Sequence, residues 1–201
     1  DYDVILTTAS LSLRLAMIAP RLKAATIGWQ HNCYDGYLHV KPVVFWQQEN
    51  LLQQYLPNLD RYIVLSDYDK RDYMEKLGID CEVKINPRSF VSEKKCDVKS
   101  KRFLMATRFV YAKGLDLMME SFEEFCKEDS EWELDIIGDG DLFDQIRADA
   151  KKRHLEKRVH FVGYTNEPEK YYLNSSVFLL PSRWEGWPMV IMEAFEFGLP
   201  V

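Results

Sequence analysis

The sequence lacks several features that are typical of common protein classes. Its 4 cysteines, Cys33, Cys81, Cys96 and Cys126, show neither Cys-x-x-Cys spacing nor an adjacent pair of histidines. The sequence therefore predicts neither a disulfide framework nor a zinc site, and a reducing, cytoplasmic setting fits best. Basic residues are outnumbered, because 26 Lys and Arg stand against 32 Asp and Glu. This balance argues against nonspecific nucleic-acid binding, so an anionic ligand would need a few well-placed cations.

Long apolar runs are also missing. No run reaches the roughly 18 to 20 residues that a membrane span requires, and the first residues lack a signal-peptide pattern. We therefore expect a chain that is soluble or peripheral, located in the cytoplasm or at the inner face of the membrane. Hydrophobic residues still make up 47% of the sequence. That share can fill one large core or two modest ones, and two fit the usual domain size better.

Short apolar stretches alternate with longer amphipathic ones. The stretches predicted as strands are DVILT, AATIGW, RYIVLS, RFLMATR, WELDIIG, VHFVGY and SVFLLPS. The main stretches predicted as helices are LSLRLAMIAPRL, DYDKRDYMEKLG with Ser66 or Asp67 as its N-cap and Gly78 at its end, LDLMMESFEEFCKE, DLFDQIRADAKKRH and MVIMEAFEFG. Alternation of this kind predicts an α/β fold with parallel sheets covered by helices on both faces.

The charged stretch VSEKKCDVKSK is the most polar connection in the chain and is interpreted as a linker. It predicts two domains, residues 1–97 with the linker and residues 98–201. The sequence opens directly on a strand and stops just after Gly198 and Pro200, which are helix stop signals. Both domains are therefore expected to be incomplete in this chain.

In parallel sheets of this kind, ligands bind beyond the carboxyl ends of the strands. The strand RFLMATR ends at Arg108, and Lys113 follows five residues later at the start of a predicted helix. Because helix N-termini also favour phosphate, this pair could clamp a pyrophosphate. Taken alone, the same two residues could equally be solvated loop charges.

The next strand ends in a tight turn, Gly138-Asp139-Gly140. The turn lacks the third glycine of a dinucleotide fingerprint, so a nicotinamide-dependent oxidoreductase is poorly supported. Asp139 and Asp141 form an Asp-x-Asp pattern that could bind a divalent metal, but an acidic residue before a helix is common for electrostatic reasons. We therefore assign no metal site.

The stretch SRWEGWPMVIMEAFEFGLP combines an apolar helix with two carboxylates, Glu185 and Glu193. Burying a carboxylate without a partner is costly, so a polar ligand is expected beside them. Carboxylates accept hydrogen bonds from hydroxyl groups, and the amides from Trp187 to Val190 could face an anion. A phosphorylated, polyhydroxylated ligand would satisfy all of these groups.

The order R-x4-K-G, G-D-G, F-x-G and P-S-x-x-E-G-x-P-x-x-x-x-E-A-x-x-x-G-x-P-V resembles the donor-binding domain of the retaining, GT-B-fold glycosyltransferases of family 4 (group 1). Many of these act in bacterial capsule, lipopolysaccharide and exopolysaccharide synthesis. The resemblance is dense over residues 101–201 and looser before them. It implies two Rossmann-like domains, an acceptor-side domain within residues 1–97 and a nucleotide-sugar domain within 98–201.

The resemblance also implies residue roles. Arg108 and Lys113 match the basic pair that binds the donor diphosphate, and Glu193 matches the glutamate that holds the ribose hydroxyls. Glu185 matches the first glutamate of an E-x7-E motif, near the transferred sugar. His31 matches a histidine that approaches the donor sugar, although a lone histidine is more often structural.

Other positions are implied to contact the nucleotide sugar. Tyr164 lies where the family holds the base, and the remaining donor contacts are Gly138, Gly186, Trp187, Met189 and Val190. The sequence departs from the pattern at Ala106-Thr107, where the family usually has a glycine before the arginine, and at INPRSF, where Asn-Gly is commoner.

The function that follows is transfer of a hexosyl group from a nucleotide-diphosphate sugar, with UDP favoured, to a saccharide or lipid-linked acceptor with retention. No cofactor or metal is expected to be required. Two alternatives stay open at this point. One is an enzyme of the same fold that resembles glycogen or sucrose synthase or a phosphorylase, and the other is a noncatalytic nucleotide-sugar binding module.

Overall fold

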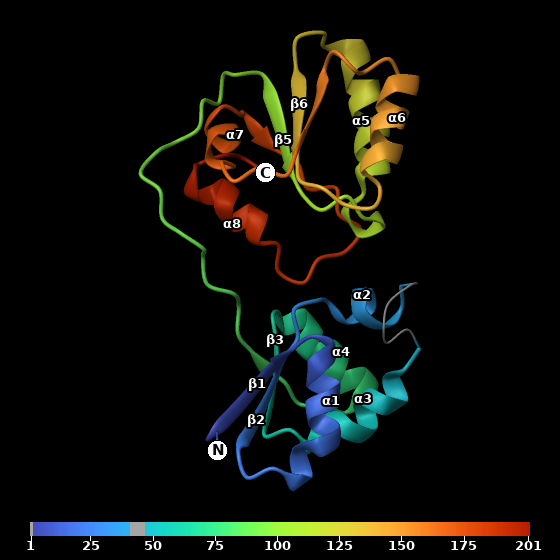
Figure 1. Ribbon diagram of the computed structural model, residues 1–201, viewed down its shortest axis with the longest axis vertical. Helices are drawn as coiled ribbons and strands as arrows, with labels where there is room; N and C mark the ends of the chain where they lie inside the picture. Colours follow the sequence, from blue (N-terminus) through green and yellow to red (C-terminus); the bar gives the residue numbers. More distant parts are fainter. Residues whose placement is uncertain (1, 41–46) are drawn as a thin grey trace. The chain divides into compact units, whose positions relative to one another are not determined.

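The computed structural model describes residues 2–40 and 47–201, which form two compact α/β units (Figure 1). The first unit contains the described residues up to Pro87 together with Trp184–Trp187. The second unit contains Arg88–Arg183 and Pro188–Val201. Each unit is built on a parallel sheet, as the alternating sequence pattern predicts.

The sheet of the first unit has the strand order β1-β2-β3-β4. Its strands are β1 (Val4–Thr8), β2 (Ala25–Trp29), β3 (Arg61–Val64) and β4 (Glu82–Val83). Its helices are α1 (Ser10–Ile18), α2 (Tyr34–Leu38), α3 (Glu49–Tyr55) and α4 (Asp67–Leu77), with short 3-10 turns at Ala19–Arg21 and Leu56–Asn58. In Figure 1, α1, α3 and α4 lie on the same side of this sheet.

The prediction of α4 and its ends is confirmed, and Ser66 is the N-cap. The Ser66 hydroxyl oxygen accepts a hydrogen bond from the Asp69 amide at 3.0 Å, which satisfies one free N–H of the first turn. Gly78 ends the helix with φ of 69°, a left-handed conformation that suits glycine. By contrast, the helix predicted over residues 11–22 changes at Ala19 into a 3-10 turn, because Pro20 cannot donate to an α-helical ladder.

The sheet of the second unit has the order β7-β6-β5-β8, and every pairing is parallel. Its strands are β5 (Arg102–Ala106), β6 (Glu133–Ile137), β7 (Val159–Gly163) and β8 (Val177–Phe178). Its helices are α5 (Leu115–Glu128), α6 (Phe143–Lys152), α7 (Glu169–Leu173) and α8 (Met189–Glu196), with a 3-10 turn at Tyr111–Lys113. Figure 1 shows α5 and α6 on one side of this sheet and α7 and α8 on the other.

The central strand β5 explains how one sheet supports two cores. Phe103 and Met105 pack into a cluster with residues of α5 and α6. Leu104 and Ala106 pack into a second cluster with residues of α7 and α8. Because successive strand side chains point to opposite faces, a continuous apolar run fills both layers.

Helix α8 begins at Met189, the first residue of the stretch predicted as this helix. Pro188 is the N-cap with ψ of 102°, so the first helical residue is Met189. Gly198 closes the helix as predicted, with φ of 66°. The N-terminus of α8 therefore comes directly after Pro188, which follows the Trp184–Trp187 segment.

The stretch predicted as a linker is bonded to the second unit. The Cys96 amide donates to the Phe197 carbonyl at 2.8 Å, and the Asp97 amide donates to the Leu173 carbonyl at 2.9 Å. Lys95 also donates from Nζ to the Glu196 carbonyl at 2.7 Å. The domain boundary after residue 97 stays a prediction. Within the described ranges, no helix is both long and apolar enough to cross a bilayer.

Candidate functional site

In the second unit, four loops follow the carboxyl ends of the parallel strands, where the sequence predicts a ligand. Backbone hydrogen bonds tie three of these loops together. The Thr107 amide donates to the Ile137 carbonyl, and the Gly138 amide donates to the Gly163 carbonyl, each at 2.9 Å. The loops after β5, β6 and β7 therefore form one continuous rim.

Arg108 lies on this rim with an exposed side chain, next to the fully buried Phe109. The Phe109 amide donates to the Asp139 carbonyl at 2.9 Å, and the Leu142 amide donates to the Phe109 carbonyl at 3.0 Å. The buried ring and these two bonds fix the backbone on which Arg108 stands. The loop that carries Arg108 is therefore fixed by hydrogen bonds even though Ala106-Thr107 stands where the family usually has a glycine.

Lys113 ends the 3-10 turn, is half-buried and is not without an interaction partner. Gly114 follows it with φ of 64° and begins α5. A Cβ at Gly114 would overlap the carbonyl oxygen of Pro181. Only glycine permits this approach, which brings the Lys113 loop against the loop after β8.

Sequence reasoning missed a second anchor of the same loops, the ion pair of Arg183 with Asp116. Both guanidinium NH groups donate to the carboxylate, at 2.8 and 2.5 Å. The hydrogen bonds that Arg183 donates to Asp116 lower the pKa of Asp116 and raise the pKa of Arg183. Arg183 also donates to the Tyr111 carbonyl at 2.9 Å. A bidentate pair of this kind restrains both loops geometrically.

The Gly138-Asp139-Gly140 turn has the tight geometry that its sequence predicts. Gly138 has φ of 124°, and a Cβ there would overlap the Thr107 carbonyl oxygen. Asp139 accepts a hydrogen bond from the Gly140 amide at 2.8 Å, whereas Asp141 is exposed two residues before α6. In residues 2–40 and 47–201, no group of three or more His, Cys, Asp or Glu side chains could hold a metal ion.

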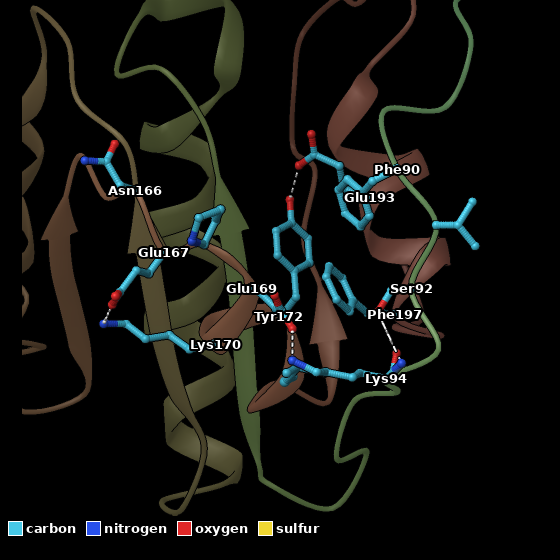
Figure 2. A pocket seen from close by; sticks show the side chains of 13 residues that line it. Phe90, Ser92, Lys94, Asn166, Glu167, Glu169, Lys170, Tyr172, Glu193 and Phe197 are labelled. Atoms are coloured by element: carbon cyan, nitrogen blue, oxygen red, sulfur yellow. Dashed lines mark hydrogen bonds and ion pairs between the residues drawn. The ribbon is translucent and has the colours of Figure 1, made fainter.

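Glu193, on α8, lines a cavity of about 750 Å³ in the second unit (Figure 2). The cavity is lined by residues of the 90–94 segment, of 166–173 and of α8 with the residue after it. Glu193 accepts a hydrogen bond on Oε2 from the Tyr172 hydroxyl at 2.8 Å. Tyr172 was not predicted as a site residue, and no local sequence signal links it to Glu193, which lies 21 positions away.

The 90–94 segment closes one wall of this cavity. The ring of Phe90 packs against that of Phe197 with 5.4 Å between centroids. Lys94 pairs with Glu169 at the start of α7, with 2.6 Å between Nζ and Oε1. The cavity is therefore bounded by a strap from the predicted linker as well as by helices.

The remaining predicted residues fall in different places. Tyr164 is 79% exposed just after β7, and Met189 and Val190 form the first turn of α8, which has no side-chain cap. Glu185, Gly186 and Trp187 belong to the short segment grouped with the first unit. His31 follows β2 in that unit, and partial burial lowers the pKa of its imidazole. The predicted roles of these residues stay predictions.

Comparison with known proteins identifies the family. Residues 89–201 match the family described as Glycosyl transferases group 1. An uncharacterized glycosyltransferase of Haemophilus influenzae is 31% identical over 71% of this chain and 41% of that protein. The lipopolysaccharide 1,6-galactosyltransferase of Salmonella typhimurium is 31% identical over 49% of this chain and 28% of that protein.

A solved structure supports the fold. The pneumococcal O-GlcNAc transferase GtfA, in complex with UDP and GlcNAc, superposes with a TM-score of 0.76 at 19% identity. That match covers 98% of this chain and 40% of the other. The chain thus spans less than half the length of these three relatives, and its two parallel-sheet units have the GT-B fold. Because the family match covers more than half of the chain, the chain belongs to the group 1 glycosyltransferases.

Proposed function

We propose that the chain is part of an enzyme that transfers a hexosyl group from a nucleotide-diphosphate sugar to a saccharide or lipid-linked acceptor. The observation that carries this proposal is the rim of strand-end loops in the second unit, which bears Arg108 and Lys113. Backbone hydrogen bonds hold these loops, and Gly114 and Gly138 lie where a Cβ would overlap a carbonyl oxygen of a neighbouring loop. A preorganised pair of cations suits a diphosphate, whose charge grows as it leaves.

The donor is proposed to be a UDP-sugar. UDP and GlcNAc are bound in the pneumococcal structure of the same fold, which supports this choice. Glu193 would accept the ribose hydroxyls in the cavity that it lines, and Tyr164 would lie near the base. The amides at the start of α8, which carry no side-chain cap, would face the phosphates.

Retention is proposed to arise from attack on the same face that the leaving group occupies. The acceptor oxygen forms a bond to the sugar carbon C1 as the bond from C1 to the diphosphate oxygen breaks, and the hydroxyl proton leaves with the diphosphate. Arg108 and Lys113 would stabilise that diphosphate, while Glu185 and His31 would contact the sugar. No covalent enzyme nucleophile is invoked, unlike in glycoside hydrolases that use a carboxylate pair.

The enzyme is proposed to act in the cytoplasm or at the inner face of the membrane, where nucleotide sugars and lipid-linked acceptors meet. We also propose that it needs no metal, because Arg108 and Lys113 would neutralise the diphosphate. Retained activity in excess EDTA would agree with this proposal. Activity lost in EDTA and restored by manganese would contradict it.

The test of the function compares Lys113→Ala with Lys127→Ala in the complete enzyme. Lys127 is an exposed lysine of the same unit that pairs with Glu124 at 2.6 Å. Lys113→Ala should lower kcat at least as much as it weakens donor binding, because the charge that it meets grows along the reaction. Lys127→Ala should change neither. Equal activity of Lys113→Ala and the parent protein would refute the diphosphate role, and consumption of inorganic phosphate instead of an acceptor would indicate a phosphorylase.

A further inference from the structure

Tyr172 is buried beside the carboxylate that we propose to hold the ribose. Its side chain is 1% exposed, and its hydroxyl donates to Glu193 Oε2 at 2.8 Å, as Figure 2 shows. The two residues come from different elements, α7 and α8, separated by 21 positions in sequence. The bond therefore depends on the packing of the unit and not on one local turn.

Stacking holds the Tyr172 ring in place. Its ring lies nearly parallel to that of Phe178 on β8, with 5.8 Å between centroids and 4° between planes. It also stacks with Phe197, at 5.2 Å and 25°. A buried ring in contact with two other rings has little freedom to move, so its hydroxyl marks a fixed point beside α8.

The protonation state of Tyr172 is also defined. Burial and then the charge of Glu193 raise the pKa of Tyr172. The hydroxyl therefore keeps its proton and acts as a donor to the carboxylate. Among the described residues, this is the one hydrogen bond of the Glu193 carboxylate. Because a carboxylate has two oxygens and about four acceptor positions, Oε1 remains available for the cavity.

We propose that Tyr172 is a positioning residue, which holds the Glu193 carboxylate in the one orientation that lets its second oxygen accept ribose hydroxyls. This inference rests on the proposed function of Glu193. Without the bond, the Glu193 side chain would sample other rotamers in the free protein. Binding the nucleotide would then cost the conformational entropy of fixing one rotamer. Prior orientation removes this cost, so Tyr172 contributes to affinity without touching the nucleotide.

The test measures selectivity for ribose in the complete chain by calorimetry. UDP, GDP and ADP are titrated into the parent protein, and the tightest binder is compared with its 2′,3′-dideoxy form. Tyr172→Phe keeps the ring and removes the hydroxyl. It should lower the preference for the ribonucleotide by about three- to tenfold, the worth of part of a charged hydrogen bond, and leave binding of the dideoxy form unchanged.

Two further variants isolate the effect. Tyr171→Phe makes the same chemical change on the same helix, at a hydroxyl without a hydrogen bond to the described residues, and should bind as the parent does. Glu193→Ala should abolish the preference, and adding Tyr172→Phe to it should change nothing more. This last result would show that Tyr172 acts through Glu193.

The outcomes separate the inference from the proposed function. If Glu193→Ala lowers the preference and Tyr172→Phe does not, the positioning role is wrong and the ribose role stands. If Tyr172→Phe weakens both forms of the nucleotide equally, the residue is merely structural and the inference fails. If Glu193→Ala leaves the preference unchanged, or if none of the three nucleotides binds, the proposed function fails and the inference with it.

Discussion

The two sheets are built from similar strands but differ in how they are covered. In the second unit, Leu104 and Met105 are adjacent on β5 and both have 0% exposure, because helices lie on both sides. In the first unit, β1 is an edge strand on which Ile5 packs into the core while Val4 and Leu6 are 53% and 50% exposed. A continuous apolar run therefore predicts a parallel strand without showing how many of its faces are covered.

The same contrast applies to glycines. Gly138 lies in the second unit, where the chain turns at the candidate site and passes against another loop. Gly78 lies in the first unit, at the end of α4, and a Cβ there would meet nothing within 4 Å. Both have positive φ, but only the first is also held by a close neighbour. Site loops thus depend on glycine for space as well as for conformation.

The largest expected effect follows from that difference. Gly138→Ala should destabilise the second unit by about 3 to 5 kcal/mol, because the new Cβ overlaps the Thr107 carbonyl oxygen and the backbone must shift. Gly78→Ala should cost only about 1 to 2 kcal/mol, from the left-handed conformation alone. Denaturant unfolding, with hydrogen exchange to assign each transition to a unit, measures both. Similar costs for the two variants would show that the site loop relaxes freely.

The next prediction concerns coverage of the sheets. Leu104→Ala should cost about 2 to 5 kcal/mol, since it opens a cavity between the strand and the helices of the second unit. Leu6→Ala, at a half-exposed position, should cost within about 0.5 kcal/mol. The same unfolding experiment checks the pair. A large loss for Leu6→Ala would mean that this face of β1 is covered in solution.

A smaller effect is expected at the N-terminus of α4. Ser66→Ala should destabilise the first unit by about 1 kcal/mol, because the amide of Asp69 loses its cap. Ser66→Thr is the matched variant, since threonine also caps, and it should recover most of the loss. Thermal unfolding of the parent protein and the two variants measures these effects. An unchanged midpoint for Ser66→Ala would show that the cap does not stabilise the first unit.

Local sequence signals were sufficient for much of this fold. The stretch LDLMMESFEEFCKE, predicted as a helix, coincides with the 14 residues of α5. The two ends of α4 were predicted from Ser66 as the N-cap and Gly78 at the C-terminus. The predicted strand SVFLLPS was too long, because only Val177–Phe178 pairs as β8 before the chain turns into the site loop. The helices α2, α3 and α7 were not predicted. They have 5, 7 and 5 residues, which is too short for a hydrophobic period to be recognised.

The candidate site shows the same division. Arg108, Lys113 and Gly138 could be named from sequence because each follows a strand that was itself predicted. The partners Tyr172 and Arg183 could not, because their contacts join positions 21 and 67 residues away. Such contacts exist only after the strands are assembled. Sequence patterns therefore predict which residues lie at the strand ends, whereas the residues that hold them in place are known only from the packed structure.

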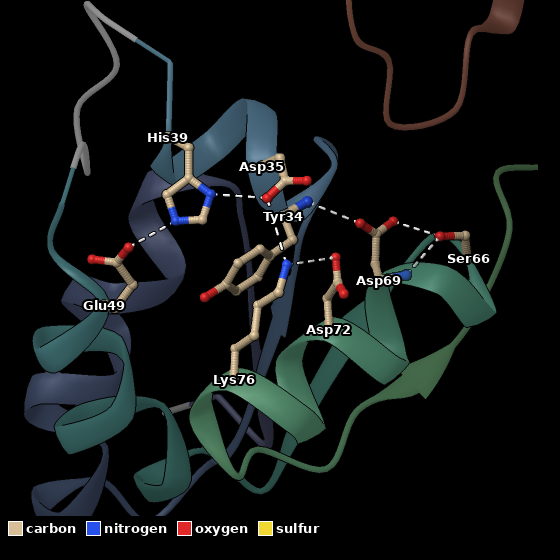
Figure 3. A network of polar contacts seen from close by, with 8 residues as sticks. All are labelled: Tyr34, Asp35, His39, Glu49, Ser66, Asp69, Asp72 and Lys76. Atoms are coloured by element: carbon tan, nitrogen blue, oxygen red, sulfur yellow. Dashed lines mark hydrogen bonds and ion pairs between the residues drawn. The ribbon is translucent and has the colours of Figure 1, made fainter.

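The smallest expected effect concerns a network of the first unit, shown in Figure 3. His39 bonds Asp35 through Nδ1 at 2.8 Å and Glu49 at the start of α3 through Nε2 at 2.9 Å. Lys76 of α4 lies 3.6 Å from the same Asp35 carboxylate, and the ring of Tyr34 packs edge-on against the imidazole. Burial by itself lowers the pKa of His39, but the two carboxylates outweigh this effect and the pKa is raised.

The sign of the pH dependence follows from that raised pKa. Protonated His39 is favoured in the folded unit, so its contribution is complete below the ordinary value of 6.5 and is lost as the pH rises through the folded value. The side chain is 43% exposed, so solvent screening limits the contribution to a few tenths to about 1 kcal/mol. Unfolding of the first unit should therefore become slightly easier from about pH 6 to pH 8. His39→Gln should flatten this dependence. Unfolding of the second unit, which does not contain position 39, supplies the internal control in the same variant. An equal slope in His39→Gln and the parent protein would show that the network does not sense pH.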